Sequence, residues 1–301
     1  MGNIVRIGID AGHGSKTAGK RTAPFTKDVD IDVDGTIDVR KGEQYREHFA
    51  NVMVADKLVT ELKRCKLFKV TIAGFDDEDG SDDEDTALGT RQVIFKSSGC
   101  EITVSVHFNA SGGSGMKFDN AEGVGIYIHD KYQGQSKKLA EIVLKHLLKG
   151  TKQKNRGVNA KSLALCNCKT MGTAASILCE LAFMTNEREA QELMANEDFC
   201  QEAAIEIAKG ICEYTKISYV EATKKTTSKL IYRVQTGAFS VYKNATTYCN
   251  TVKKAGFKDA YVKYSAGLYK VQIGAYSVKG NANNMLTKIK KAGFPAFITT
   301  N

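Results

Sequence analysis

Short apolar runs alternate with longer segments of helical spacing over the first 216 residues. Four short runs have the length and composition of buried strands. They span residues 4–10, 102–106, 125–128 and 177–181. Three longer segments repeat apolar side chains every three or four residues, which predicts helices. They span residues 44–64, 136–149 and 187–214, and Asn196 is expected to cap a second helix within the last of them. This alternation predicts an α/β fold, a mainly parallel sheet with helices on both faces.

The last quarter of the chain contains an internal repeat with an offset of 37 residues. The sequence YRVQTGAFSV at residues 232–241 returns as YKVQIGAYSV at 269–278, and KKAGF at 253–257 returns at 290–294. Each copy predicts a strand, a helix that ends before a glycine, and a second short strand. Two copies predict a small α+β domain of βαββαβ order, with a four-stranded sheet backed by two helices.

Charge is distributed very unevenly between these two regions. Residues 229–301 contain twelve Lys and Arg against one acidic residue, whereas the other 228 residues contain 31 basic and 33 acidic residues. Residues 217–228 have no apolar period and are rich in Thr and Lys. We therefore expect a first domain at 1–216, a linker at 217–228 and a basic domain at 229–301. Such a concentration of positive charge favours binding to an acidic polymer.

Other features of the sequence limit the class of protein. No apolar stretch is long enough to cross a membrane, so no membrane insertion is expected. The N-terminal segment has the pattern of a core strand and not of a secretory signal, which predicts synthesis in the cytoplasm. Eight cysteines are spread without close pairing, which predicts reduced thiols. The acidic run at residues 76–85 is expected to be a solvated, mobile loop.

Polar side chains follow or interrupt three of the predicted strands. The first strand leads into His13, the second leads into His107 and Asn109, and the third carries Glu180 within an apolar run. Functional groups of α/β proteins gather at the carboxyl ends of parallel strands. A buried glutamate costs several kcal/mol unless it is paired, protonated or close to a metal. Either a functional site or a buried ion pair of Glu180 with Arg91 or Arg156 would satisfy this requirement.

These residues lie in motifs that identify a family resemblance over about residues 3–214. The chain resembles the zinc N-acetylmuramoyl-L-alanine amidases of bacterial autolysins and phage endolysins. The resemblance rests on GIDAGHG at 8–14, Glu47 followed by Asn51, RGV at 156–158, SVHFNA at 105–110, and LCELAF at 178–183 leading into TNE at 185–187.

The resemblance implies a metal site and a reaction. It implies that His13, Glu47 and His107 bind one zinc ion and that Glu180 is the catalytic acid/base. Two imidazoles, one carboxylate and a water form a common catalytic zinc site. By chemistry alone His48 is as good a ligand as Glu47, and only the register of the resemblance favours Glu47.

The implied substrate is bacterial peptidoglycan, cleaved at the amide between N-acetylmuramic acid and L-alanine. Asn109 and Arg156 are then candidate substrate-binding residues. Two alternatives stay open at this point: a zinc carboxypeptidase or endopeptidase acting on the stem peptide, and a non-catalytic wall-binding protein. Without a secretory signal, we expect the protein to reach the wall after holin-type release or mother-cell lysis.

The basic repeat resembles the SPOR domain, which implies binding to the glycan strands of peptidoglycan. Side chains from the first strand of each copy are the candidates for sugar contacts. They are Tyr232, Arg233, Gln235, Tyr269, Lys270 and Gln272. A basic βαββαβ domain also describes an RNA-recognition module, but the RNP1 pattern of that class is absent. Nucleic acid is therefore not the expected partner.

Overall fold

The computed structural model describes residues 3–112, 117–222, 231–265, 267–276 and 279–300. The chain divides into two compact units. The first contains Met1–Asp32 and Asp38–Ala222, and the second contains Thr223–Asn301 together with Val33–Ile37. Of the segment expected to be a linker, residues 223–228 lie outside the described residues.

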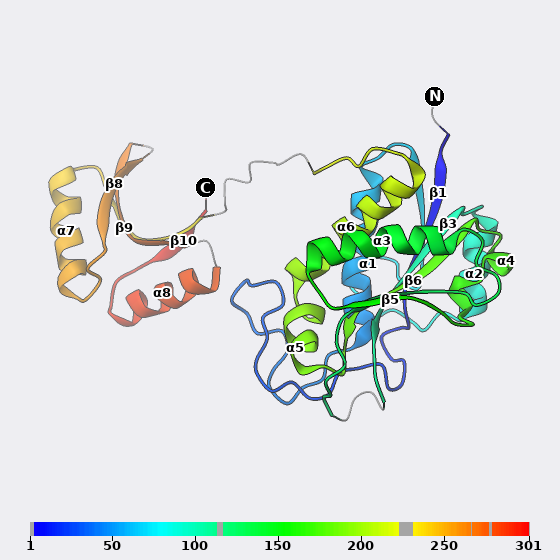
Figure 1. The fold of residues 1–301 in the computed structure, drawn as a ribbon. Helices are drawn as coiled ribbons and strands as arrows, with labels where there is room; N and C mark the ends of the chain where they lie inside the picture. Colours follow the sequence, from blue (N-terminus) through cyan, green and yellow to red (C-terminus); the bar gives the residue numbers. More distant parts are fainter. Residues whose placement is uncertain (1–2, 113–116, 223–230, 266, 277–278, 301) are drawn as a thin grey trace. The chain divides into compact units, whose positions relative to one another are not determined.

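The first unit is built on a six-stranded sheet (Figure 1). Its strands are β1 (Val5–Ala11), β2 (Phe68–Ala73), β3 (Ile102–Asn109), β4 (Val124–Ile128), β5 (Asn155–Ala160) and β6 (Ala175–Phe183), in the order β2-β1-β3-β6-β4-β5. Neighbouring strands are parallel except β4 and β6, which are antiparallel. The prediction of a mainly parallel sheet is confirmed, and β2 and β5 are additional strands that the hydrophobic pattern did not predict.

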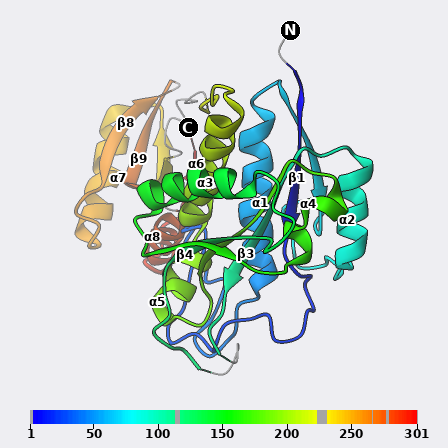
Figure 2. The ribbon, with the colours of Figure 1, turned by 45° about the vertical axis from the view of Figure 1, so that its right-hand side comes forward.

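Helices cover both faces of this sheet, as predicted. The larger group packs on one face and consists of α1 (Glu47–Lys63), α3 (Ser136–Thr151) and α6 (Glu197–Thr215). The other group contains α2 (Leu88–Ser97), α4 (Cys168–Met171) and the 3₁₀ turn at Ala164–Cys166, and Figure 2 shows α2 and α4 apart from the first group. Between β6 and α6 the chain forms α5 (Glu187–Glu189) and a π-helical turn at Ala190–Met194. Asn196 caps α6 by accepting a hydrogen bond from the Phe199 amide, as predicted.

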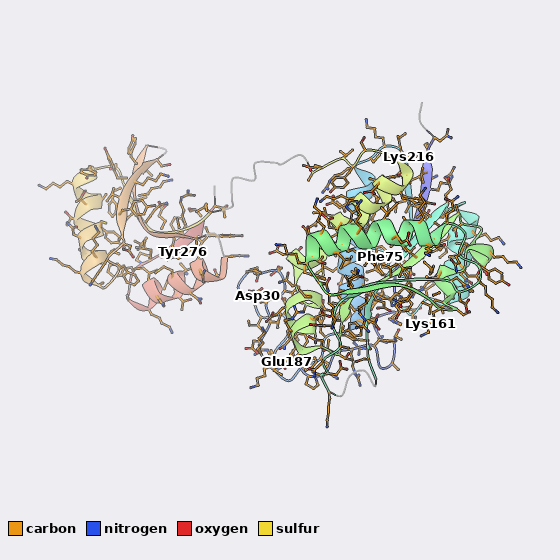
Figure 3. All side chains as sticks on the ribbon, in the orientation of Figure 1. Asp30, Phe75, Lys161, Glu187, Lys216 and Tyr276 are labelled. Atoms are coloured by element: carbon orange, nitrogen blue, oxygen red, sulfur yellow. The ribbon has the colours of Figure 1, made fainter. Side chains whose placement is uncertain are left out.

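Alternation along the strands separates an apolar face from a polar one. Ile7 and Ile9 of β1 enter the large hydrophobic core under α1 and α6, where Figure 3 shows side chains filling the space between the layers. Asp10 points to the opposite face and accepts a hydrogen bond from Ser105 Oγ of β3, at 2.5 Å. Gly8 lies on that face too, because a Cβ there would come within 2.5 Å of the Phe95 ring of α2. This second face therefore carries polar groups such as Asp10 and Ser105 beside a smaller apolar cluster around Phe95.

The cysteines and the helices bear on two further features drawn from the sequence. All eight cysteines are free and buried. Within the ranges that the structure describes, no helix is both long and apolar enough to cross a membrane.

The second unit is the βαββαβ domain that the repeat predicts. It contains β7 (Tyr232–Phe239), α7 (Tyr242–Lys254), β8 (Tyr261–Ser265), β9 (Leu268–Tyr276), α8 (Lys279–Lys291) and β10 (Phe297–Thr299). The sheet is antiparallel with the order β10-β7-β9-β8. Gly256 and Gly293, just beyond the two helices, have φ values of +105° and +85°, the left-handed conformation in which glycine commonly ends a helix. Residues 277–278 of the repeat lie outside the described residues.

Candidate metal and catalytic site

Three side chains that are far apart in the sequence meet at the carboxyl edge of the first sheet. Glu47, at the first turn of α1, contacts His107 of β3 through Oε1, with 3.0 Å to Nδ1. Its other oxygen, Oε2, lies 3.3 Å from Nε2 of His13, in the turn after β1. Potential ligand atoms of all three lie within 4.8 Å of one another. The structure therefore brings together the three residues that the resemblance implied as metal ligands.

The backbone around His13 is shaped for this approach. His13 has a φ of +67°, a left-handed conformation that costs a non-glycine residue about 1–2 kcal/mol. Gly12 lies directly against the His107 ring, since a Cβ at this position would be 2.5 Å from Nδ1 and nearer still to Cε1 and Nε2. Only a residue without a side chain lets the turn pass this close to the second histidine.

Charge and burial act against each other within the cluster. Burial opposes ionisation of Glu47, but the hydrogen bond with His107 and the nearby imidazole of His13 outweigh it and hold the pKa of this carboxyl well below its usual range. Burial also lowers the pKa of His13, whereas at His107 the contact with Glu47 overcomes burial and raises the pKa. The Lys20 ammonium lies 3.9 Å from Glu47 Oε2, a neighbour that no sequence motif indicated.

Two atoms of the cluster are buried and lack a hydrogen-bond partner within the described residues: His13 Nε2 and Glu47 Oε2. Orphaned buried polar atoms are rare in folded proteins, and an unplaced ion is one of their explanations. Here both atoms are potential metal ligands that face each other. The two imidazoles and the carboxylate are the donor set of catalytic zinc sites. The residues present thus fit a zinc ion.

Glu180 lies next to this cluster. It pairs with His107 in the parallel register of β3 and β6, which places both side chains on the same face of the sheet. Its Oε2 is buried and forms no hydrogen bond within the described part of the chain. Burial raises the pKa of Glu180 to about 7.

The alternative of a buried ion pair for Glu180 is wrong. Arg91 binds Asp10, 2.8 Å away, on a different part of the polar face. Arg156 lies over the Phe183 ring at 4.8 Å and donates to the Glu122 carbonyl oxygen.

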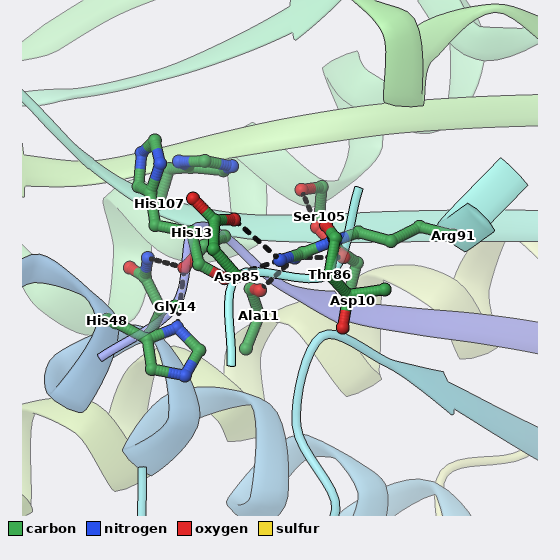
Figure 4. A network of polar contacts seen from close by, with 12 residues as sticks. Asp10, Ala11, His13, Gly14, His48, Asp85, Thr86, Arg91, Ser105 and His107 are labelled. Atoms are coloured by element: carbon green, nitrogen blue, oxygen red, sulfur yellow. Dashed lines mark hydrogen bonds and ion pairs between the residues drawn. The ribbon is translucent and has the colours of Figure 1, made fainter. Parts of the chain in front are cut away.

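The position of His48 decides between the two adjacent candidate ligands. Its Nδ1 lies 2.7 Å from the Gly12 carbonyl oxygen and its Nε2 lies 2.8 Å from Asp83 Oδ2. Figure 4 shows His48 directed away from the pair of rings formed by His13 and His107. Asn51, one turn further along α1, donates to the same Gly12 carbonyl at 3.0 Å. Hence Glu47 belongs to the cluster, while His48 holds the backbone beneath it.

The two candidate substrate-binding residues of this unit lie outside the metal cluster. Asn109 ends β3, and its Oδ1 accepts a hydrogen bond from the Ala110 amide at 2.8 Å. Arg156 is exposed in the edge strand β5. Their contacts with substrate stay predictions.

The candidate sugar-binding residues of the second unit differ in exposure. Gln235 and Gln272 are opposite each other on β7 and β9 and are each only 4% exposed. Tyr261 of β8 donates a hydrogen bond to Gln272 Oε1 at 2.8 Å, so this amide already has a protein partner. The other four candidates, Tyr232, Arg233, Tyr269 and Lys270, are half-buried. Their part in glycan binding stays a prediction.

An α/β sheet whose carboxyl edge carries a His–Glu–His cluster beside a buried glutamate has the side chains of a hydrolase site that could hold a metal. Comparison of the sequence with known families gives the particular family. Residues 7–213 match the model of the N-acetylmuramoyl-L-alanine amidases, and residues 228–300 match the SPOR domain. The chain therefore belongs to the N-acetylmuramoyl-L-alanine amidase family, whose reaction is hydrolysis of an amide bond in peptidoglycan. Membership favours an amidase over the alternative peptidases, and the SPOR match favours a wall-binding domain over an RNA-recognition module.

Individual relatives agree with this assignment. The chain is 28% identical over 208 residues to the uncharacterized protein YqiI of Bacillus subtilis (strain 168). This match covers 68% of this chain and 82% of that protein. It is 30% identical over 135 residues to an uncharacterized cell wall amidase of Bacillus anthracis, covering 42% of this chain and 24% of the relative.

Solved structures share the fold of the first unit. The N-acetylmuramoyl-L-alanine amidase from Clostridium difficile 630 superposes with a TM-score of 0.57 and 24% identity, covering 71% of this chain and 98% of that structure. The catalytic domain of CwlV from Bacillus (Paenibacillus) polymyxa var. colistinus gives a TM-score of 0.53 at 24% identity, covering 71% and 100% of the two chains.

Proposed function

We propose that this protein is a zinc-dependent amidase in which His13, Glu47 and His107 hold the metal and Glu180 is the general acid/base. The observation that carries this proposal is the pair of buried, unbonded atoms, His13 Nε2 and Glu47 Oε2, beside an equally unbonded Glu180 Oε2. A metal between the first two and a water near the third would satisfy all of these atoms.

Zinc bound in this way supplies Lewis acidity, which lowers the pKa of a coordinated water and polarises a carbonyl group. Glu180 then accepts the proton of the attacking water at its free carboxylate oxygen and delivers it to the departing amine of L-alanine. Burial of Glu180 suits both halves of this transfer, because a carboxyl with a raised pKa both accepts and returns a proton near neutral pH.

The variant Glu180→Gln tests the role of this side chain. It keeps the shape of the site and removes the basic oxygen, so we expect full zinc content and a loss of wall hydrolysis of about 10²–10⁴-fold. Glu141→Gln on the exposed side of α3 is the matched control and should behave as the unmodified protein. Metal content by atomic absorption and release of soluble wall fragments are the measurements. An active Glu180→Gln protein would remove this residue from the mechanism.

Mass spectrometry of the digestion products tests the bond that is cleaved. An amidase leaves intact glycan strands and releases stem peptides with a free L-alanine amine. Shortened stem peptides still attached to muramic acid would instead show a carboxypeptidase or endopeptidase. Zinc absent from the gently purified protein, with no products of any kind, would favour the non-catalytic wall-binding alternative.

For the second unit we propose binding to the glycan strands of peptidoglycan, supported by the SPOR match and the concentration of positive charge. Sedimentation with purified cell walls, compared with an RNA gel shift at the same salt concentration, separates wall binding from binding to any polyanion. Equal retention on both polymers would show that charge alone is responsible.

A further inference from the structure

The acidic run at residues 76–85 is not only a solvated loop. Most of its side chains are exposed, but Gly80 is buried, and a Cβ there would lie 3.0 Å from Val52 Cγ2 of α1. The end of the run packs against the turn that carries His13. Most of the run is solvated, as expected, but its last residues also contact the turn after β1.

Several hydrogen bonds join this acidic end to the turn after β1. The Asp83 carbonyl oxygen accepts from both the amide and the hydroxyl of Ser15, at 3.0 and 2.7 Å. Thr17 Oγ1 donates to Asp85 Oδ2 at 2.6 Å and accepts from the Gly14 amide at 3.0 Å. Gly14 packs closely against the backbone of the loop, since a Cβ on Gly14 would come within 2.5 Å of the Asp85 amide nitrogen.

His48 connects the same loop to the other side of the turn. One of its ring nitrogens faces the Asp83 carboxylate and the other faces the Gly12 carbonyl oxygen, the residue directly before His13. The imidazole is 1% exposed and the Asp83 side chain is 9% exposed, so solvent screens this contact little. Asp83 therefore reaches the turn by two routes, through its own carbonyl oxygen and through His48.

Arg91 of α2 also binds the turn that carries His13. Its guanidinium donates to the carbonyl oxygens of Ala11 (2.5 Å), His13 and Thr86 (2.8 Å), and Figure 4 shows these contacts converging on one group. With the contacts of His48 and Asn51, the carbonyl oxygens of Ala11, Gly12 and His13 are thus all held from outside the turn. A backbone with positive φ at a non-glycine residue persists only where its surroundings determine it.

We propose that residues 83–86 form a positioning element for the metal site, which acts through His48 and Arg91 to hold His13 in its ligating orientation. Asp83 is the central positioning residue of this element, and its hydrogen bonds join it to Ser15 and His48 and not to the three proposed metal ligands. The inference rests on the proposed role of His13 as a metal ligand.

The variant Asp83→Ala tests this element in the full-length protein. Loss of an outer partner of a metal site commonly weakens metal binding by about 10–100-fold. We expect zinc affinity, measured by competition with a chromophoric chelator, to fall about tenfold or more. The absorption bands of the cobalt(II)-substituted protein should shift, and hydrogen exchange of the Ser15 amide in the metal-free protein should accelerate. Asp82→Ala, an exposed neighbour that removes the same charge, should leave all three readouts unchanged.

Two results would overturn the inference. One is an Asp83→Ala protein that matches Asp82→Ala in zinc affinity, cobalt spectrum and exchange. The other is a lower melting temperature with unchanged zinc affinity, which would show a merely structural role. If Asp83→Ala does not fold, Ser15→Ala decides, because it removes one bond to the Asp83 carbonyl oxygen and should still weaken zinc binding. Failure of the unmodified protein to bind zinc would instead refute the proposed function.

Discussion

Substitution of Gly12 by alanine gives the most direct test of the site geometry. Gly12 does not have a left-handed backbone, so alanine meets no conformational penalty there. The added methyl group would instead lie 2.5 Å from His107 Nδ1 and closer to two other ring atoms. Ordinary carbon contacts begin at about 3.5 Å, so the ring or the turn must move by roughly 1 Å.

The size of the expected effect follows from the tolerance of metal coordination. Overpacking of this kind costs about 1–3 kcal/mol, and zinc sites tolerate deviations of only about 0.2 Å in ligand distance. The His107 ring is held by Glu47 on its other side, so relief of the overlap separates His107 from Glu47 or displaces His13. At 1.4 kcal/mol for each factor of ten, the upper end of this range corresponds to about hundredfold weaker zinc binding.

Zinc affinity by chelator competition, together with wall clearing and thermal unfolding, measures this effect. Gly89→Ala is the matched control, because Gly89 lies in α2 and a Cβ there meets no atom within 4 Å. Alanine in that helix should be neutral or should stabilise the protein by up to about 1 kcal/mol. A Gly12→Ala protein with unchanged zinc affinity and full activity would refute the close approach of the turn to His107.

Three further predictions concern stability and the metal. Arg91→Met leaves the buried Asp10 carboxylate unpaired and should lower the free energy of unfolding by about 3–5 kcal/mol in urea titrations; a loss below about 1 kcal/mol would contradict the buried pair. Asn196→Ala removes the cap of α6 and should cost about 1 kcal/mol, with Asn196→Gly intermediate; equal stability of all three proteins would exclude the cap. Dialysis against a chelator should abolish wall hydrolysis and lower the melting temperature, and added zinc should restore both; full activity after complete zinc removal would exclude metal catalysis.

The hydrophobic pattern predicted the four central strands of the first sheet and missed its two edge strands. The strands β1, β3, β4 and β6 lie inside the sheet, where nearly every residue is buried. By contrast β2 and β5 are its two edge strands. β5 has the sequence NRGVNA, with Val158 as its one large apolar residue and Asn155 and Arg156 exposed. β5 therefore leaves no periodic signal, whereas β2, with the sequence FKVTIA, alternates apolar and polar residues and was missed in spite of that pattern.

The three proposed metal ligands also differ in how well the sequence located them. His13 and His107 follow strands in motifs, so the sequence located them. The choice between Glu47 and His48 required the structure, because adjacent helical residues point about 100° apart and only the orientation of α1 decides which one faces the cluster. That orientation depends on long-range contacts such as the bond from the Glu47 amide to the Lys20 carbonyl oxygen, at 3.0 Å. Lys20 and Asp83 belong to irregular loops, whose packing no sequence period encodes.

Strand alternation gave an incomplete description of the second unit. The sequence made Gln235 and Gln272 candidates for contacts with sugar. In the structure, irregularities in register occur on both sides of Gln235 in β7, and the two glutamines face each other with little exposure. A bulge adds one residue to a strand and reorients the side chains around it, which a strict period of two does not anticipate.

The buried pair of Arg91 and Asp10 is weak evidence for stability, since apolar residues of similar volume often replace such pairs without loss. Both side chains are only 1% exposed, so each carries a large desolvation penalty. The guanidinium directs its remaining donors to backbone carbonyl oxygens at and beside His13, whose φ of +67° is itself unfavourable. The contacts of Arg91 are costly, and they converge on one strained turn. They are better explained by the need to fix His13 in this turn than by a gain in stability. A rigid ligand binds metal with less loss of conformational entropy. On the proposed function, the fold therefore gives up stability at this point and gains an ordered site for the metal.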